Sequence, residues 1–223
     1  MKTDSELSDF IISPPYVLSD KDNADIFKAS HGHPRKEDWE SKCLDSFKGH
    51  VRTYYKKLQN YKCAYCRMDI SMATSYFTID HVVPKSTHEE WMYNPINLCL
   101  SCAVCNSSKY NKNVLKRDKY VSLPTESSEY IIVHPHKDRY SEHIEIIEGL
   151  LYKGLTPKGV NTIEICNLTR IGLLTERAKN IIKAEKGGAF AKLMAICTCN
   201  PFLIKDMDEL IESIKDLIEN NVC

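Results

Sequence analysis

The 223-residue sequence has no long hydrophobic run, no net charge and no internal repeat. None of its apolar stretches approaches the ~18–20 residues of a membrane-spanning helix, so we expect no membrane partner. The segment Met1-Lys-Thr-Asp-Ser5 lacks the apolar core of a secretory signal, which favours a cytoplasmic protein. Repeat and low-complexity architectures are excluded because neither pattern occurs. What is left is the composition of an ordinary folded chain, with 43% hydrophobic residues.

The absence of net charge argues against a free-standing nucleic-acid binder. Thirty basic and thirty acidic residues cancel, whereas phosphate contacts by Lys and Arg supply much of the affinity of such proteins. The charge is uneven, because residues 109–119 hold five basic residues against one acidic, and residues 205–219 hold six acidic against two basic. We expect weak intrinsic binding and a partner or oligomer that delivers the nucleic acid. Sub-micromolar affinity of the isolated chain for plain duplex at physiological salt would contradict this.

Cysteine, by contrast, is plentiful: the chain has ten, and four of them form two short pairs. Cys63 and Cys66 form one C-x-x-C, and Cys102 and Cys105 form the other. Two such pairs on tight turns can converge on a tetrahedral zinc. A thiol-redox motif would need only one pair, close to a βαβ pattern that is not found here. Grouped cysteines without a secretory signal also indicate a reducing cytosol. The sequence therefore predicts a structural zinc site.

One nearby cysteine leaves an alternative open. Cys99 continues the three-residue spacing to Cys102 and Cys105, and it could compete as a zinc ligand. The alternation of the surrounding residues does not settle which face Cys99 occupies. The other cysteines are expected to be free thiols that behave as small apolar groups: Cys43, Cys166, Cys197, Cys199 and Cys223.

A set of polar residues lies between and just after the cysteine pairs. Residues 76–79 alternate like a short strand, which ends at Asp80-His81. Residues 97–101 are typical of a returning strand, and a helix is expected from Ala103 to Lys112. Elements this small cannot bury a core alone, so a bound zinc would supply much of their stability.

The residue types at the end of the first strand suit hydrolysis of a phosphodiester. A neutral imidazole, with a pKa near ~6.5, can accept a proton from water, which makes His81 a candidate general base. A carboxylate and an amide oxygen, such as those of Asp80 and Asn106, can hold a divalent cation against the developing charge. Neighbouring residues of an ideal strand face opposite ways, so the scheme needs a bend after Asp80, which Pro84 favours.

These residues together resemble the zinc-stapled HNH endonuclease motif over about residues 61–112. The positions that carry the resemblance are Cys63, Cys66, Ile79 to Ser86, Asn97-Leu98, Cys102, Cys105-Asn106 and Lys109. The resemblance implies an α+β fold with a ββα-metal (HNH) core, held by a structural four-cysteine zinc and flanked by helical and small β elements. It also implies one catalytic divalent cation.

The same resemblance assigns roles within the core. Asp80 and Asn106 would bind the catalytic cation, His81 would be the general base, and Asn97 would brace the loop that carries His81. The third signature position holds Asn106 rather than the His of many members. Its hard oxygen suits Mg²⁺ or Mn²⁺.

Three further polar residues carry open alternatives. Lys109 could contact a phosphate as a point charge, or be a solvated lysine on the helix. His134 and His136 follow a strand-like run and could line the same cleft, or they could cap a turn around Pro135, which we favour.

The flanks divide the chain into an N-terminal arm and amphipathic helix (residues 1–60), the core (61–115) and a mixed β/helical region (116–223). The first thirty residues are expected to form a loose arm, and apolar spacing predicts a helix from Arg35 to Leu58. In the last region we expect a strand at 129–133, a hairpin of 143–147 with 150–152 around Glu148-Gly149, and helices at 172–186, 189–197 and 207–220, with a break at Gly187-Gly188.

The last region is similar to HNH nucleases of prokaryotic antiphage defence, in particular the nuclease subunit of Septu-type systems, including those attached to retrons. The residues that carry this similarity are His134-Pro-His136-Lys-Asp138, Gly149, Asn161 to Arg170 and Glu176-Arg177. It implies an ATPase partner of the ABC/SMC type. Such a partner would account for a neutral surface and an acidic C-terminal helix.

The combined expectation is a metal-dependent endonuclease that hydrolyses nucleic-acid phosphodiesters, with DNA favoured. The same chemistry on RNA, such as a tRNA loop, stays open because the site contacts the phosphate and does not read the sugar. A non-catalytic zinc-held module that binds nucleic acid or protein is the alternative from another class. It predicts that His81→Ala leaves function intact, whereas the enzyme loses activity with its zinc content unchanged.

Overall fold

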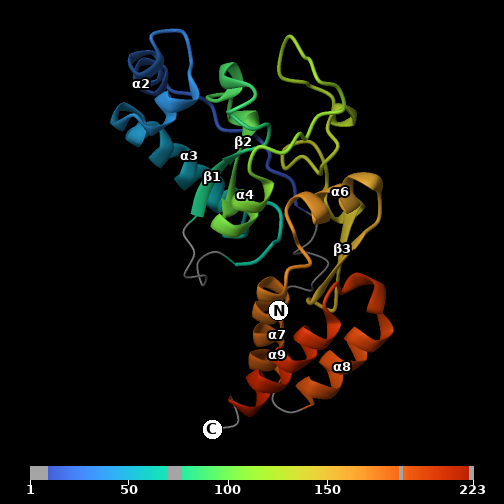
Figure 1. Ribbon diagram of the computed structural model, residues 1–223. Coiled ribbons are helices and arrows are strands. Elements are labelled where there is room, and N and C mark those ends of the chain that lie inside the picture. The colour runs from blue at the N-terminus through green and yellow to red at the C-terminus, as the bar shows by residue number, and fades with distance from the viewer. Residues whose placement is uncertain (1–9, 70–76, 186–187, 221–223) are drawn as a thin grey trace.

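The computed structural model describes residues 10–69, 77–185 and 188–220. At its centre is a strand–strand–helix unit. β1 (Phe77–His81) and β2 (Leu98–Cys102) pair antiparallel, and α4 (Ala103–Lys109) follows at once and packs on both strands (Figure 1). The predicted ββα order is confirmed. α4 ends at Lys109 rather than Lys112, because Tyr110 takes a positive φ of 45° that stops the helix.

The loop between the two strands contains two short 3₁₀ turns, η3 (Glu89–Trp91) and η4 (Pro95–Asn97). Pro95 lies in the first turn of η4, where its missing N–H costs nothing. β1 ends at His81, and the next backbone N–H, that of Val82, donates to Asn97 O at 2.8 Å. The loop is therefore held against the end of the sheet where it starts and where it returns.

The N-terminal flank is helical where a loose arm was predicted. α2 (Asp20–Ser30) begins with a capping box, in which Ser19 accepts from the Asp22 N–H and the Asp22 carboxylate accepts from the Ser19 N–H. The prediction was therefore wrong for this segment, since a polar composition also suits a capped surface helix.

Before α2, the chain is extended and anchored in the core. Phe10 and Ile12 are buried, and the Ile12 N–H donates to Pro135 O at 2.8 Å. These anchors lie in contacts with distant residues, which a loose-arm prediction could not include. Residues 1–9 lie outside the described residues.

The predicted helix from Arg35 to Leu58 is split. The 3₁₀ turns η1 (Lys36–Glu40) and η2 (Lys42–Leu44) precede α3 (Asp45–Leu58), and Ser41 between the turns has an extended backbone. Apolar spacing continues across this break, so periodicity alone did not reveal it. α3 packs on both strands of the central sheet. Its buried face is formed by Phe47, Val51 and Tyr55.

The predicted hairpin is confirmed. β3 (Ile144–Ile147) pairs antiparallel with β4 (Leu151–Gly154), and Glu148 and Gly149 both have positive φ, at 48° and 71°. Two consecutive positive φ values are typical of the tight turn that matches the twist of a hairpin. The predicted strand at 129–133 is wrong. Instead there is a 3₁₀ turn, η5 (Ser127–Glu129), and an isolated bridge between Tyr130 and Leu115.

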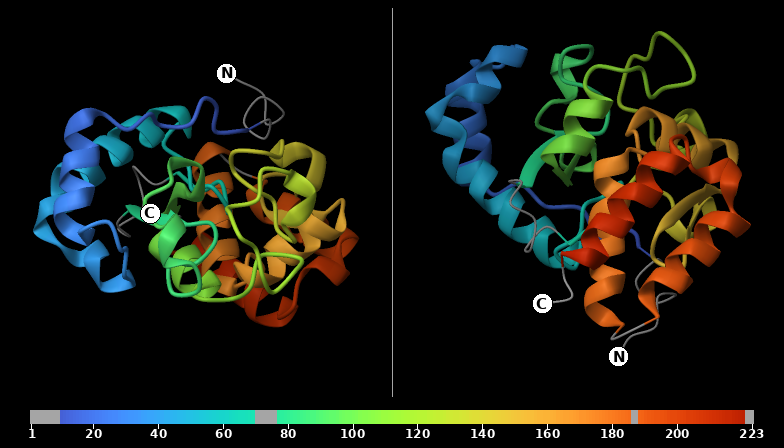
Figure 2. Two further views of the ribbon diagram at one scale, coloured as in Figure 1. Left: turned by 90° about the horizontal axis from the view of Figure 1, so that it is seen from above. Right: turned by 60° about the horizontal axis from the view of Figure 1, so that its bottom comes forward.

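The C-terminal region continues as helices that pack on one another. The three predicted helices are confirmed as α7 (Ile171–Ala184), α8 (Ala189–Cys199) and α9 (Met207–Glu219), and Figure 2 shows them together on the far side of the core from α2 and α3. Gly187 of the predicted break lies outside the described residues. The remaining elements are α5 (Tyr140–His143), α6 (Pro157–Ile165) and η6 (Pro201–Leu203).

Buried side chains from all three predicted segments join one hydrophobic cluster. The core unit is thus packed between an N-terminal flank and a C-terminal flank. Within the described residues, no helix has both the length and the apolar content that crossing a membrane requires.

Candidate functional site

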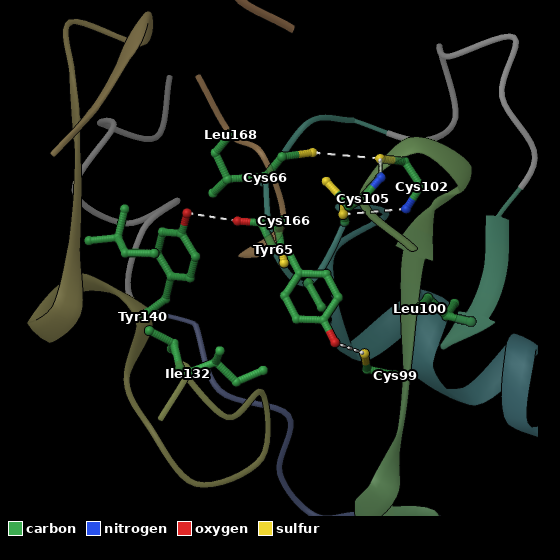
Figure 3. Packing of buried hydrophobic residues seen from close by; sticks show 14 of the residues in the cluster. Tyr65, Cys66, Cys99, Leu100, Cys102, Cys105, Ile132, Tyr140, Cys166 and Leu168 are labelled. Atoms are coloured by element: carbon green, nitrogen blue, oxygen red, sulfur yellow. Dashed lines mark hydrogen bonds between the residues drawn. The ribbon is translucent and has the colours of Figure 1, made fainter. Parts of the chain in front are cut away.

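The four paired cysteines form one buried cluster. Their Sγ atoms all lie within 4.8 Å of one another, and Cys66 Sγ is 3.9 Å from Cys102 Sγ. Zn–S bonds of about 2.3 Å in a tetrahedron require sulfurs about 3.8 Å apart. The thiol set of Cys63, Cys66, Cys102 and Cys105 therefore fits a structural zinc (Figure 3).

Backbone N–H groups already face this cluster. The Cys102 N–H donates to Cys63 Sγ at 3.3 Å, and the Cys105 N–H, in the first turn of α4, donates to Cys102 Sγ at 3.4 Å. Such bonds favour the thiolate that a metal needs. The Arg170 guanidinium lies 3.5 Å from Cys105 Sγ. A positive charge therefore faces the sulfurs from outside the two C-x-x-C turns, Cys63–Cys66 and Cys102–Cys105, which we call the first and second knuckle.

Cys99 is not part of the cluster. Its thiol donates to the Tyr65 hydroxyl at 3.7 Å, and Figure 3 shows it further along β2, apart from the sulfurs of Cys66, Cys102 and Cys105. The alternative of Cys99 as a competing ligand is therefore excluded by geometry. Burial raises its pKa well above the usual thiol value, which keeps it neutral.

A cavity of about 590 Å³ opens between β1, α4 and the α3 flank. It brings together Asp80 and His81 from the end of β1 and Asn106 from α4. Asp80 and His81 are consecutive strand residues, yet both line this cavity, at the point where β1 ends. Asn97, the fourth predicted catalytic residue, is fully buried and does not line it.

His81 is held in one orientation by two neighbours. Its Nε2 lies 3.1 Å from Met92 O, and its ring packs edge-on against Trp39 with centroids 4.4 Å apart. A carbonyl only accepts, so Nε2 carries the hydrogen and Nδ1 is left as the acceptor. Burial, with the charges of Lys85 and Lys109, lowers the pKa of His81 to about 3. The imidazole is therefore neutral at physiological pH.

Asp80 is a buried carboxylate, and side chains contact both of its oxygens. Oδ2 accepts from the Tyr65 hydroxyl at 2.6 Å, and Oδ1 lies 3.2 Å from Lys109 Nζ. Burial raises the pKa of the Asp80 carboxyl, and the Lys109 ammonium opposes that shift. A carboxylate has about four lone-pair positions, so these two side-chain contacts and the hydrogen bond from the His81 backbone leave room for a cation.

Lys109 corrects a prediction. Its side chain is fully buried, and Nζ donates to His81 O at 2.8 Å in addition to its ion pair with Asp80. It does not line the cavity. The alternative of a solvated lysine was wrong, because the ammonium is buried where it balances the Asp80 carboxylate. The phosphate contact stays a prediction.

Asn106 and Asn97 make different kinds of contact. The Asn106 amide N–H donates to Thr78 Oγ1 at 3.1 Å, which leaves Oδ1 for another partner, and Thr78 shares a face of β1 with Asp80. Asn97 Oδ1 accepts from the Val83 N–H at 2.8 Å, and its amide donates to Val83 O at 3.0 Å. These paired bonds are what bracing of the loop after His81 requires.

His134 and His136 belong to a turn, as favoured, and neither lines the cavity. The His136 N–H donates to His134 Nδ1 at 3.1 Å, and the Lys137 N–H donates to His134 O at 3.0 Å. The His136 ring donates to Leu98 O at 2.7 Å, so the turn is fastened to β2.

Sequence reasoning missed several residues of the site. Tyr65 lies between the cysteines of the first knuckle, and no pattern marked it as a partner of Asp80. Trp39 was assigned only to helix packing, although it contacts the His81 ring. Lys48 and Arg52 of α3 line the cavity, and their four-residue spacing was the available signal.

Residues 63–112 match the family model described as HNH endonuclease. The ββα unit and the four grouped cysteines lie within this match, so this part of the chain is an HNH domain. The expectation drawn from the motif is confirmed at the level of the family.

The similarity to particular relatives extends beyond that domain. The chain is 27% identical over 127 residues to Septu protein PtuB of Bacillus thuringiensis, which covers 57% of this chain and 44% of that protein. It is 32% identical over 149 residues to Septu protein PtuB of Bacillus mycoides (strain KBAB4), which covers 58% of this chain and 50% of that protein. The chain spans about half the length of the curated relatives it matches.

Proposed function

We propose that this protein is a metal-dependent HNH endonuclease that hydrolyses nucleic-acid phosphodiester bonds, with DNA as the favoured substrate. The observation that carries the proposal is the arrangement of Asp80, His81 and Asn106 around one cavity, within the segment that matches the HNH family. A neutral imidazole beside two hard oxygen ligands suits the activation of water next to a phosphate.

In this proposal, His81 is the general base. Nδ1 accepts the proton of the attacking water, while the Nε2–H bond to Met92 O holds the ring in place. The low pKa of His81 keeps it unprotonated, and a phosphate in the cavity would stabilise the imidazolium that forms. Asn97 positions His81 by tying Val83, two residues further on, to the returning strand.

Asp80 and Asn106 would hold the catalytic cation, Mg²⁺ or Mn²⁺, through a carboxylate oxygen and an amide oxygen. When bound, such a cation stabilises the charge that develops on the phosphate and on the leaving oxygen. Tyr65 and Lys109 orient the Asp80 carboxylate from behind. The four grouped cysteines hold zinc in a structural role, away from this chemistry.

The first test is a nuclease assay with Mg²⁺ or Mn²⁺ on a panel of DNA and RNA. His81→Ala is expected to reduce cleavage by about 10²–10⁴, with zinc content unchanged. His33→Ala, which removes an exposed histidine in the loop after α2, is the matched control and keeps full activity. Equal cleavage by the His81→Ala protein and the wild type would rule out this mechanism and favour the zinc-held binding module. Cleavage of RNA and not of DNA would favour the alternative of an RNA substrate, such as a tRNA loop.

We also propose that the protein acts as the effector nuclease of an antiphage defence complex with an ABC/SMC-type ATPase. This rests on the similarity to the two Septu PtuB proteins and on the resemblance to Septu-type and retron-attached nucleases. The assay is therefore run with and without an ABC/SMC-type ATPase. Co-purification of the two proteins, and loss of phage protection with His81→Ala, are the expected results. Protection that survives His81→Ala would contradict an effector role.

A further inference from the structure

The cavity wall opposite α4 is built by α3 and η1, which precede the HNH segment. Its lining includes four basic residues, Lys36, Lys48, Arg52 and Lys85, against the acidic residues Glu40 and Asp80. Asp80 is already paired with Lys109. In a chain whose formal charge is zero, this cavity therefore has a local excess of positive charge.

Three of the four Lys and Arg residues of α3 form a regular row. Lys48, Arg52 and Lys56 follow one another at intervals of four residues, so their positions rise by about 6 Å per step along one side of the helix. Each comes directly after one of the buried residues Phe47, Val51 and Tyr55. The row thus lies beside the packed face, and two of its members, Lys48 and Arg52, line the cavity. Its spacing is comparable to that of successive phosphates along a strand.

The ends of this row are fixed relative to the candidate catalytic residues. Lys48 Nζ lies 5.3 Å from the ring centroid of Trp39, and Trp39 packs against His81. Lys56 Nζ lies 5.6 Å from the ring centroid of Phe77, at the start of β1. Aromatic rings that line the cavity therefore hold both outer lysines near β1.

We infer that Lys48, Arg52 and Lys56 of α3 bind consecutive phosphates of a nucleic-acid strand and lead that strand to His81. The inference rests on the proposed nuclease function and names the surface that positions its substrate. α3 lies outside residues 63–112, so the contact surface is not part of the matched HNH segment. If these three side chains only contacted solvent, replacing them would change binding no more than replacing another exposed charge of α3, and this difference can be measured.

The test measures binding separately from cleavage. All variants carry His81→Ala, so that no probe is cut, and all are checked for zinc content and circular dichroism. Binding of labelled duplex DNA, single-stranded DNA and RNA of one sequence is followed by fluorescence anisotropy between about 50 and 200 mM salt. Arg52→Gln is compared with Lys57→Gln, which removes an exposed charge on the other side of the same helix.

Each lost phosphate contact is expected to make the slope of log Kobs against log salt shallower by about 0.9 for duplex, or by about 0.7 for single strands. Arg52→Gln gives one such step, and the triple variant with Lys48→Gln and Lys56→Gln gives about three. Lys57→Gln leaves the slope and the affinity unchanged. The probe that shows the full step expected for its type identifies the strand type that the row binds.

Equal effects of Arg52→Gln and Lys57→Gln would overturn the inference, as would undetectable binding by the parent protein at low salt. Cleavage by the wild type is measured on the same probes. If the wild type cleaves the probes but the salt slope of the triple variant is unchanged, the row is not a binding surface and the nuclease proposal stands. A changed slope without any cleavage keeps the row as a binding surface and counts against the nuclease.

Discussion

Single residues in this site are defined by their partners as much as by their chemistry. Lys109 occupies a signature position of the HNH motif, yet its ammonium is buried between Asp80 and the carbonyl of His81. Removing one member of a buried ion pair leaves the other charge uncompensated, which costs more than the pair contributes when intact. The lysine therefore holds both candidate catalytic residues, Asp80 and His81, at the end of β1.

Replacing Lys109 tests this at the scale of one residue. Lys109→Met is expected to lower the free energy of unfolding by about 3–5 kcal/mol, as measured by urea denaturation. Lys119→Met, at an exposed position in the basic segment 109–119, is the control, and its free energy of unfolding stays within about 0.5 kcal/mol of the wild-type value. Adding Asp80→Asn to Lys109→Met should recover part of the loss, because the unpaired charge is gone. A Lys109→Met protein as stable as the control would show that the pair is dispensable.

At the scale of elements, the C-terminal flank holds the first knuckle by its backbone. Arg177 of α7 and the Tyr152 hydroxyl of β4 both donate to Cys66 O, and the Tyr140 hydroxyl donates to Tyr65 O at 2.8 Å. Tyr65 in turn donates to Asp80. Two arginines of the second resemblance, Arg170 and Arg177, thus have a structural role: they join the helices to the two knuckles.

Arg170 is the contact that faces the sulfurs themselves. Four thiolates around Zn²⁺ carry a net negative charge, which the guanidinium 3.5 Å from Cys105 Sγ offsets. Arg170→Gln is expected to speed zinc release to a colorimetric chelator by about tenfold or more. Arg117→Gln, at an exposed arginine paired with Glu129, should release zinc at the wild-type rate. Unchanged release from Arg170→Gln would mean that the arginine serves packing alone.

At the scale of the whole molecule, the burial of three histidines makes the free energy of unfolding depend on pH. Burial lowers the pKa of His136 to about 4, that of His81 to about 3, and that of His134 well below its usual value. The unfolded chain takes up protons below pH ~6.5 and the folded chain does not. The stabilising contribution is therefore complete above pH ~6.5 and is lost as the pH falls toward the folded pKa values.

The expected result is a free energy of unfolding that decreases from pH 6.5 to 5, with each buried histidine contributing up to about 1.4 kcal/mol per pH unit. His136→Gln should make this slope shallower by up to one proton. His33→Ala should leave it unchanged, since His33 is exposed. Zinc release is followed in parallel so that metal loss is not mistaken for titration. A slope that His136→Gln does not alter would contradict the assignment.

Local features of this protein were predictable from its sequence. The two C-x-x-C pairs, the Asp80-His81 strand end and the spacing to Asn106 depend on a few neighbouring residues, and so do the ββα order and the hairpin at Glu148-Gly149. Helix periodicity was equally readable in α7, α8 and α9. The same rules failed for α2 and for residues 129–133. There a side-chain cap, or packing without strand pairing, decided the conformation.

The sequence by itself determined the four grouped thiols that fit a zinc, the strand end and the candidate catalytic set, because short-range spacing specifies them. Only the tertiary structure decided which groups surround them. It buried Lys109 against Asp80, set Cys99 apart from the cluster, packed Trp39 on His81 and made α3 the basic wall of the cavity. Each of these depends on which distant segments pack side by side, and burial then fixes the charge state and partner of every polar group enclosed there.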